Sequence, residues 1–401
     1  MGRMPLFPTT PNTPPRPSAP APVPPTTGTV PAVPSAAFPS LSATTGPTGA
    51  AASFPASAAM SSPHAAATAT TPLGADDVER ARRLVERVRT RFAAALVGQE
   101  RLRESLIATL VAGGHILIES VPGLAKTTAA QTLASCVSGS FRRVQCTPDL
   151  MPSDLTGTQV FDFASQRFTT QIGPIHANIV LLDEINRSNA KTQSAMLEAM
   201  AEGATTIGGE RIALPKPFMV IATQNPIEEE GTFNLPEAQM DRFMMKTVMT
   251  YPSPDEEAAM LALVTRRGTD TLDPSQTNPD AISLHDVEFL RAAARRVHVS
   301  DAIMRYAVDI AATSRGAGSR PVKGLSQLVR LGASPRASIA LVRVGQANAL
   351  LAGRDYVIPE DVRAFAAEIL RHRIILTFEA MADGVDADQV VDSIVRAVPV
   401  P

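Results

Sequence analysis

The sequence predicts an α/β domain built on a parallel sheet, followed by a domain made only of helices. Five short strand candidates alternate with helical stretches: "HILIE", "RRVQC", "ANIVLLDE", "PFMVIATQ" and "KTVMT". Short buried strands that alternate with helices are typical of a parallel sheet covered on both faces. From about residue 284 the strand patterns stop, and the apolar residues follow helical spacing instead.

Helices are predicted before and after the first strand. The stretch "ADDVERARRLVERVRTRFAAALVGQ" has an apolar stripe at helical spacing, with acids at its start. A second helix, in "VGQERLRESLIATLVAGG", ends at Gly113 and Gly114. After the strand and a tight turn, a third helix is expected from about Lys126 to Cys136, and "AKTQSAMLEAMAEG" predicts another.

Two hairpins are predicted as insertions in the α/β domain. Residues 158–172 alternate in polarity around a polar turn at 164–166, and "ATTIGGERIAL" has Gly208 and Gly209 at its turn. In the helical domain, the predicted helices lie in "LHDVEFLRAAARRVHV", "DAIMRYAVDIAATSR", "SPRASIALVRVGQANALLAG" and "PEDVRAFAAEIL".

Changes in composition divide the chain into four segments. Residues 1–74 hold 17 of the 34 prolines, and their only charged residues are Arg3 and Arg16. Such a segment cannot bury enough apolar surface to offset the entropy of ordering, so we predict a disordered tail. We expect the α/β core at 75–267, a linker at 268–283 and the helical domain at 284–401.

Composition also excludes several classes of protein. A net charge of −2 gives no basic excess for nucleic acid, and two cysteines cannot form a disulfide framework. We find neither an apolar run long enough to span a bilayer nor the pattern of a signal peptide. We therefore expect a cytoplasmic protein with no direct membrane insertion.

The stretch "ESVPGLAKTT", residues 119–128, joins the first strand to a helix through a tight turn. This arrangement gathers backbone N–H groups at a helix N-terminus, which favours a bound phosphate. Lys126 adds a positive charge, and the Thr127 hydroxyl can bind Mg²⁺. Lys126 and Thr127 match the pattern GxxxxGK[ST] and Gly123 is kept within it, but Ser120 and Ala125 stand at its two glycine positions. If this stretch is considered without the other motifs, an ordinary strand, turn and helix with no bound phosphate explains it equally well.

Polar residues at the ends of two later strands favour the phosphate interpretation. Asp183 and Glu184 end one strand, where ligands of parallel sheets bind. Asp183 can bind Mg²⁺, and Glu184 can polarise a water that attacks the γ-phosphate. Asn225 ends another strand, and its amide could contact that water or the phosphate, although Asn-Pro is also common in turns.

Two arginines are further candidates. Arg242 follows a short helix that begins near Pro236, and its distance along the chain from the phosphate loop suggests that it faces a neighbouring subunit's nucleotide. Arg336, in the first turn of a helix of the second domain, could reach the nucleotide across the cleft. Arg187 is a weaker candidate of the same type. For each arginine alone, a surface salt bridge is the simpler explanation.

The motifs "VGQE", "VPGLAKT", "LLDEINR", "ATQNP", "LPEAQMDRF" and "GASPRAS" together resemble the MoxR family of AAA+ ATPases, over nearly all of residues 76–395. The resemblance implies an AAA+ P-loop core with an inserted β-hairpin, a helical lid, and hydrolysis of ATP with Mg²⁺. It assigns Lys126 and Thr127 to Walker A, Asp183 and Glu184 to Walker B, Asn225 to sensor one, Arg242 to the arginine finger and Arg336 to sensor two. The expected nucleotide contacts are Val97, Gly98 and Gln99 beside the adenine, and Pro122, Gly123, Leu124, Ala125, Lys126, Thr127 and Thr128 around the phosphates.

One residue departs from the family pattern. Members generally have glycine where this chain has Ser120. If that position required a positive φ, serine would cost about 1 kcal/mol or more and would lower nucleotide affinity.

The resemblance also implies partners. An arginine finger that acts on a neighbour requires a head-to-tail homo-oligomer, for which the family expectation is a hexameric ring. Chaperone-like remodelling or activation of protein clients is expected, with a von Willebrand factor A domain partner. Two alternatives stay open: a nucleotide-gated binding scaffold for that partner, and a nucleic-acid motor. The motor is disfavoured because the inserted hairpin has only Arg167 as a cation.

Overall fold

The computed structural model describes residues 72–227, 231–267 and 280–401. The predicted tail up to residue 71 and most of the predicted linker, residues 268–279, lie outside the described residues. The four segment boundaries are therefore kept as predictions.

Five parallel strands form the central sheet of the described chain, in the order β10-β1-β9-β6-β3. They are β1 (Ile116–Glu119), β3 (Phe141–Gln145), β6 (Ile179–Asp183), β9 (Met219–Gln224) and β10 (Met245–Val248). Each overlaps one of the five strand candidates of the sequence, with β3 and β10 beginning one residue earlier than predicted, and the α/β fold class is confirmed.

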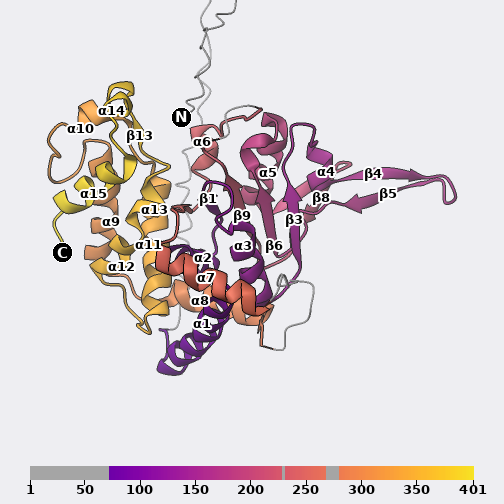
Figure 1. Cartoon of the computed structure of the whole chain (residues 1–401), viewed down its shortest axis with the longest axis horizontal. Helices are drawn as coiled ribbons and strands as arrows, with labels where there is room; N and C mark the ends of the chain where they lie inside the picture. Colours follow the sequence, from indigo (N-terminus) through magenta and orange to yellow (C-terminus); the bar gives the residue numbers. More distant parts are fainter. Residues whose placement is uncertain (1–71, 228–230, 268–279) are drawn as a thin grey trace, which may run out of the picture. The chain divides into compact units, whose positions relative to one another are not determined.

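Helices cover both faces of this sheet (Figure 1). Ile116 and Ile118 belong to one buried cluster, and Leu117 between them belongs to the other, because side chains alternate along a strand. The first cluster includes residues of α1 (Ala75–Ala95), α2 (Glu100–Ala112) and α3 (Lys126–Ser135), and the second includes residues of α5 (Ala190–Glu202). Burial on both sides explains why the three inner strands, β1, β9 and β6, are largely apolar, whereas the edge strands β3 and β10 carry polar residues.

Both predicted hairpins are present. After α4 (Pro152–Thr156), β4 (Gly157–Asp162) pairs antiparallel with β5 (Arg167–Ile172) and extends away from the α/β core (Figure 1). The second hairpin pairs β7 (Ala204–Ile207) with β8 (Glu210–Ala213). Its turn residues Gly208 and Gly209 have φ of 58° and 86°, which glycine adopts without a steric penalty.

The region after residue 284 is helical. Its helices are α8 (Leu284–Arg296), α9 (Asp301–Ser314), α10 (Leu325–Leu328), α11 (Pro335–Leu351), α12 (Pro359–Ala364), α13 (Ala366–Leu370), α14 (Phe378–Ala382) and α15 (Ala387–Ala397). Helices α8 and α11 both pack against α2 and belong to the same buried cluster as α1–α3. The lid region therefore shares one hydrophobic core with one face of the sheet.

The remaining elements of the described chain include η1 (Ile185–Arg187), α6 (Glu237–Met240), α7 (Pro254–Arg267), and the paired strands β2 (Val137–Ser138) and β11 (Ile282–Ser283). The lid also contains an antiparallel pair, β12 (Val329–Leu331) with β13 (Ile375–Leu376), where the sequence predicts only helices. Runs of two or three residues are too short to show a strand period. No helix among the described residues is both long and apolar enough to cross a membrane.

Candidate active site

The carboxyl ends of the sheet strands bring the candidate phosphate and metal ligands to one edge. In the parallel register Glu119 of β1 lies opposite Gln224 of β9, and Gln145 of β3 lies opposite Asp183 of β6. Strand β9 lies between β1 and β6. The loop after β1, Asp183 and Asn225 therefore meet at this edge, where α/β sheets bind ligands.

The loop after β1 turns sharply into α3. Gly123 has φ of 86° and Ala125 has φ of 59°, and the helix begins at Lys126. The left-handed backbone of Ala125 is a strained conformation for a residue with a side chain. The Lys126 side chain is only 9% exposed, and its ammonium donates a hydrogen bond to the Ser120 carbonyl at 3.2 Å. The ammonium therefore lies over the loop instead of extending into solvent.

Ser120 does not have the positive φ that would strain it. The left-handed residues of the loop are Gly123 and Ala125. Ser120 is buried, and its hydroxyl donates to the Val121 carbonyl at 2.8 Å. The backbone penalty considered from the sequence for Ser120 therefore falls on Ala125 instead.

Asp183 and Thr127 form a ligand set that fits Mg²⁺. The Thr127 hydroxyl donates to Asp183 Oδ2 at 3.2 Å, and the Thr223 hydroxyl donates to Oδ1 at 2.8 Å. Hydroxyl and carboxylate oxygens are ligand types that Mg²⁺ takes, usually together with substrate phosphates. Within the described ranges no group of three or more His, Cys, Asp or Glu residues could hold a metal alone. A metal here would therefore need the phosphates as further ligands.

Glu184 lies at the same edge in a left-handed conformation, with φ of 57°. Its backbone N–H donates to the Thr223 hydroxyl at 2.9 Å. Its carboxylate accepts hydrogen bonds from Gln145 Nε2 at 3.0 Å and Arg187 Nη1 at 3.1 Å. These contacts hold the carboxylate on the β3 side of Asp183.

Asn225 is buried directly after β9. Its amide oxygen accepts the Ile227 N–H at 3.2 Å, so it has the turn role considered from the sequence. Its amide nitrogen makes no hydrogen bond with a described residue and could still donate to a ligand. On the β10 side, Gly98 and Gln99 have positive φ, and Gln99 Nε2 donates to the Thr250 carbonyl at 3.1 Å. The 97–99 loop therefore lies beside the same edge.

Sequence reasoning missed three polar neighbours of the acid pair: Arg143, Gln145 and Thr223. Arg143 Nη2 and Nε donate to Asp183 Oδ2 at 2.6 and 3.1 Å. A signal was available, because Arg143 and Gln145 alternate with buried Val144 and so share one face of β3. Their pairing with Asp183 and Glu184 depends on the register of β3 with β6, which a single sequence does not give.

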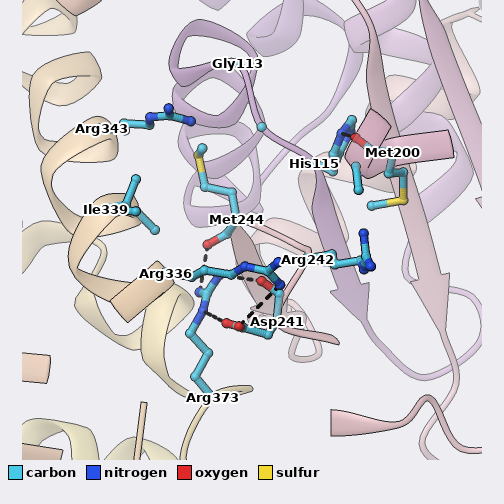
Figure 2. Close-up of a pocket in the computed structure, with 13 residues that line it drawn as sticks. Gly113, His115, Met200, Asp241, Arg242, Met244, Arg336, Ile339, Arg343 and Arg373 are labelled. Carbon is cyan, nitrogen blue, oxygen red and sulfur yellow. Dashed lines mark hydrogen bonds and ion pairs between the residues drawn. The ribbon is translucent and has the colours of Figure 1, made fainter. Parts of the chain in front are cut away.

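The two candidate arginines lie at the opposite edge of the sheet. Arg242 precedes β10, whose first residue, Met245, pairs with Ile116 at the start of β1. Strand β1 has four residues and so separates the two edges by about 13 Å. Arg242 and Arg336 line a cavity of about 380 Å³ together with Arg343 (Figure 2). In this structure the fold of α11 places Arg336 with Arg242 and not at its own chain's phosphate loop, and a role for Arg336 at a nucleotide stays a prediction.

Asp241 connects the sheet to the lid beside this cavity. Arg373, which is buried, donates from Nε to Asp241 Oδ1 at 2.7 Å, and Ser334 donates to Oδ2 at 2.9 Å. Arg336 Nη1 lies 3.6 Å from Oδ2 (Figure 2). Because Asp241 is next to Arg242 in the chain, these contacts hold the backbone before Arg242 beside Arg336, while Arg242 Nη1 donates to the Leu197 carbonyl at 3.2 Å. Burial lowers the pKa of His115, on the cavity wall, to about 4, so this ring is neutral.

Comparisons with known proteins agree with this geometry. The model of the ATPase family associated with various cellular activities (AAA) matches residues 115–245, and an AAA lid domain model matches residues 325–394. The chaperone MoxR1 of Mycobacterium tuberculosis is 40% identical over 330 residues, which cover 82% of this chain and 86% of that protein. The chain belongs to the MoxR family of AAA+ ATPases.

Other MoxR-family relatives are similar over most of their length. YeaC of Bacillus subtilis is 44% identical over 76% of this chain and 91% of its own, and MoxR of Paracoccus denitrificans is 30% identical over 76% and 93%. A crystal structure of a protein from Cytophaga hutchinsonii has a TM-score of 0.73 at 39% identity, covering 81% of this chain and 97% of that one. The AAA+ fold with a helical lid is thereby established for this member of the MoxR family.

Replacing Ser120 with glycine tests how the phosphate loop tolerates serine. Because Ser120 lacks a positive φ, we expect Ser120→Gly to change ATP affinity by less than about threefold, while Lys126→Ala weakens it at least about tenfold. Isothermal titration with Mg²⁺ present measures both. An increase in affinity of tenfold or more in Ser120→Gly would show that serine strains the loop.

Proposed function

We propose that this chain binds and hydrolyses ATP with Mg²⁺, and uses the hydrolysis for chaperone-like remodelling or activation of client proteins. The observation that carries the proposal is the 3.2 Å contact of the Thr127 hydroxyl with the Asp183 carboxylate, beside the Lys126 ammonium. A hydroxyl, a carboxylate and an ammonium at a helix N-terminus suit a Mg²⁺–triphosphate group. Membership of the AAA+ family supports the same assignment.

Each residue at the phosphate edge has a proposed role. The Lys126 ammonium binds the β- and γ-phosphates, and the backbone of residues 122–128 surrounds them. Mg²⁺, when bound through Thr127 and Asp183, supplies charge that stabilises the transferred phosphoryl group. Glu184 orients and polarises the attacking water, and the Asn225 amide donates to that water or to the γ-phosphate.

The arginines at the other edge are proposed to act on a neighbouring subunit. Arg242 and Arg336 lie across the sheet from their own phosphate loop, so a head-to-tail interface would bring them to the next subunit's nucleotide. Permanently charged guanidinium groups suit transition-state charge on phosphoryl oxygens. We propose a closed ring for this assembly, with six subunits as the family expectation.

The inserted hairpin favours a protein client over nucleic acid. Phe161, Phe163 and Phe168 form edge-to-face contacts near its turn, and Phe163 is 85% exposed. The hairpin has one cation, Arg167 at the start of β5, which is too little positive charge to follow a phosphate backbone. An exposed aromatic cluster of this kind suits an apolar protein surface. A von Willebrand factor A domain partner and a cytoplasmic location are kept as predictions.

Replacing Glu184 tests whether the chain acts through ATP hydrolysis or as a nucleotide-gated scaffold. We expect Glu184→Gln to lower ATP turnover about 100-fold or more, since general-base assistance is lost, with ATP affinity largely kept. Steady-state phosphate release and isothermal titration measure the two quantities. Client activation that persists in this variant at the wild-type level would favour the scaffold instead.

Mixed assemblies test whether the arginines act across the interface. We expect Lys126→Ala and Arg242→Ala each to abolish most ATP turnover. Lys126→Ala removes a phosphate ligand from its own subunit's site, and Arg242→Ala removes the cation that acts on the neighbouring subunit's nucleotide. An equal mixture of the two variants should recover roughly a quarter of wild-type turnover, since some interfaces then join an intact loop to an intact arginine. A mixture that recovers nothing, although the two variants co-assemble, would place Arg242 within its own subunit's site.

A further inference from the structure

Arg143 is the charged partner of the candidate magnesium ligand in the structure. Its Nη2 and Nε donate to Asp183 Oδ2 at 2.6 and 3.1 Å, and its Nη2 also donates to Gln145 Oε1 at 3.3 Å. The Asp183 side chain is 8% exposed, whereas the Arg143 side chain is 47% exposed. A buried carboxylate is thus neutralised by a guanidinium that reaches it from the solvent side.

Arg143 donates to the same Asp183 oxygen, Oδ2, that a bound metal ion would use. Asp183 Oδ2 also accepts the Thr127 hydroxyl, whereas Oδ1 is directed to the Thr223 hydroxyl. A Mg²⁺ ion bound through Thr127 and Asp183 would therefore compete for Oδ2. Mg²⁺ requires close, nearly octahedral oxygen ligands and repels a guanidinium on the same oxygen.

We propose that Arg143 is the counter-ion of Asp183 in the nucleotide-free protein and that the arriving magnesium–nucleotide displaces it. The inference rests on the proposed function, because it requires the metal to bind at Thr127 and Asp183. Arg143 is then a positioning residue: its hydrogen bonds to Oδ2 hold the carboxylate in its orientation until the metal replaces it. Its half-exposed side chain can move into solvent without disturbing the core.

The replacement of Arg143 by Mg²⁺ at Asp183 affects the concentration of Mg²⁺ that nucleotide binding requires. Breaking the pair with Arg143 offsets part of the gain from binding the metal, so removing Arg143 should make the metal bind more tightly. The same removal should destabilise the nucleotide-free protein, since Asp183 loses its charged partner. After the metal has bound, the loss of Arg143 should matter little.

Thermal unfolding of the full chain tests the first consequence. In EDTA, we expect Arg143→Gln to lower the melting temperature by about 2–4 °C, and most of that difference to vanish with saturating Mg²⁺ and ADP. Arg142→Gln is the matched control. Arg142 is the adjacent exposed residue of β3, and its side chain makes no hydrogen bond or ion pair in the described part of the chain. An equal loss of melting temperature with and without Mg²⁺ and ADP would overturn the proposal.

Titration with Mg²⁺ at a fixed concentration of a fluorescent ADP tests the second consequence. We expect Arg143→Gln to need at least about threefold less Mg²⁺ for half-maximal binding, with Arg142→Gln unchanged and Arg143→Lys close to wild type. A higher Mg²⁺ requirement in Arg143→Gln would overturn the proposal and make Arg143 a direct ligand of the nucleotide. If the wild-type protein shows no Mg²⁺-dependent binding of ADP, the proposed function itself fails and the inference fails with it.

Discussion

The buried carboxylate of Asp183 is the constraint on which the phosphate edge of the sheet depends. An ionised carboxylate with so little exposure requires several hydrogen bonds and a charge partner. It obtains them from three elements: Thr127 at the start of α3, Thr223 on β9 and Arg143 on β3. The position of this carboxylate is therefore fixed only when the sheet register and the start of α3 are both correct.

The candidate functional residues also lie in two groups, at opposite edges of the parallel sheet. The lysine, the acids and Asn225 lie at the carboxyl edge, and Arg242 and Arg336 lie with the lid beside the amino edge. Asp241, held by Arg373 of the lid, connects the second group to the start of β10. The contacts of Asp241 therefore join the lid to the segment that carries Arg242. In a ring, this arrangement would link one subunit's lid to its neighbour's nucleotide.

Much of the fold was predictable because its strands, helices and turns depend on local sequence patterns. The short strand candidates predicted the five strands, and Gly208 and Gly209 predicted the turn of a hairpin. Lys126, Asp183 and Glu184 were predicted to lie at one edge of the sheet because their motifs follow strand ends, and the structure places them there.

Features that depend on tertiary structure were not predictable from one sequence. The contact of Arg143 with Asp183 requires the β3–β6 register, and the location of Arg336 requires the packing of α11. The sequence left open whether Ser120 is strained, because a motif position does not reveal which residue of the loop takes a positive φ.

A structure of the assembled protein with Mg²⁺ and a non-hydrolysable ATP analogue tests the central claim most directly. The account predicts the β- and γ-phosphates within hydrogen-bonding distance of the Lys126 ammonium, with the metal ion beside Thr127 and Asp183. It also predicts the guanidinium groups of Arg242 and Arg336 at the neighbouring subunit's nucleotide. An analogue bound away from the 122–128 loop, or a metal ion away from Asp183, would contradict it.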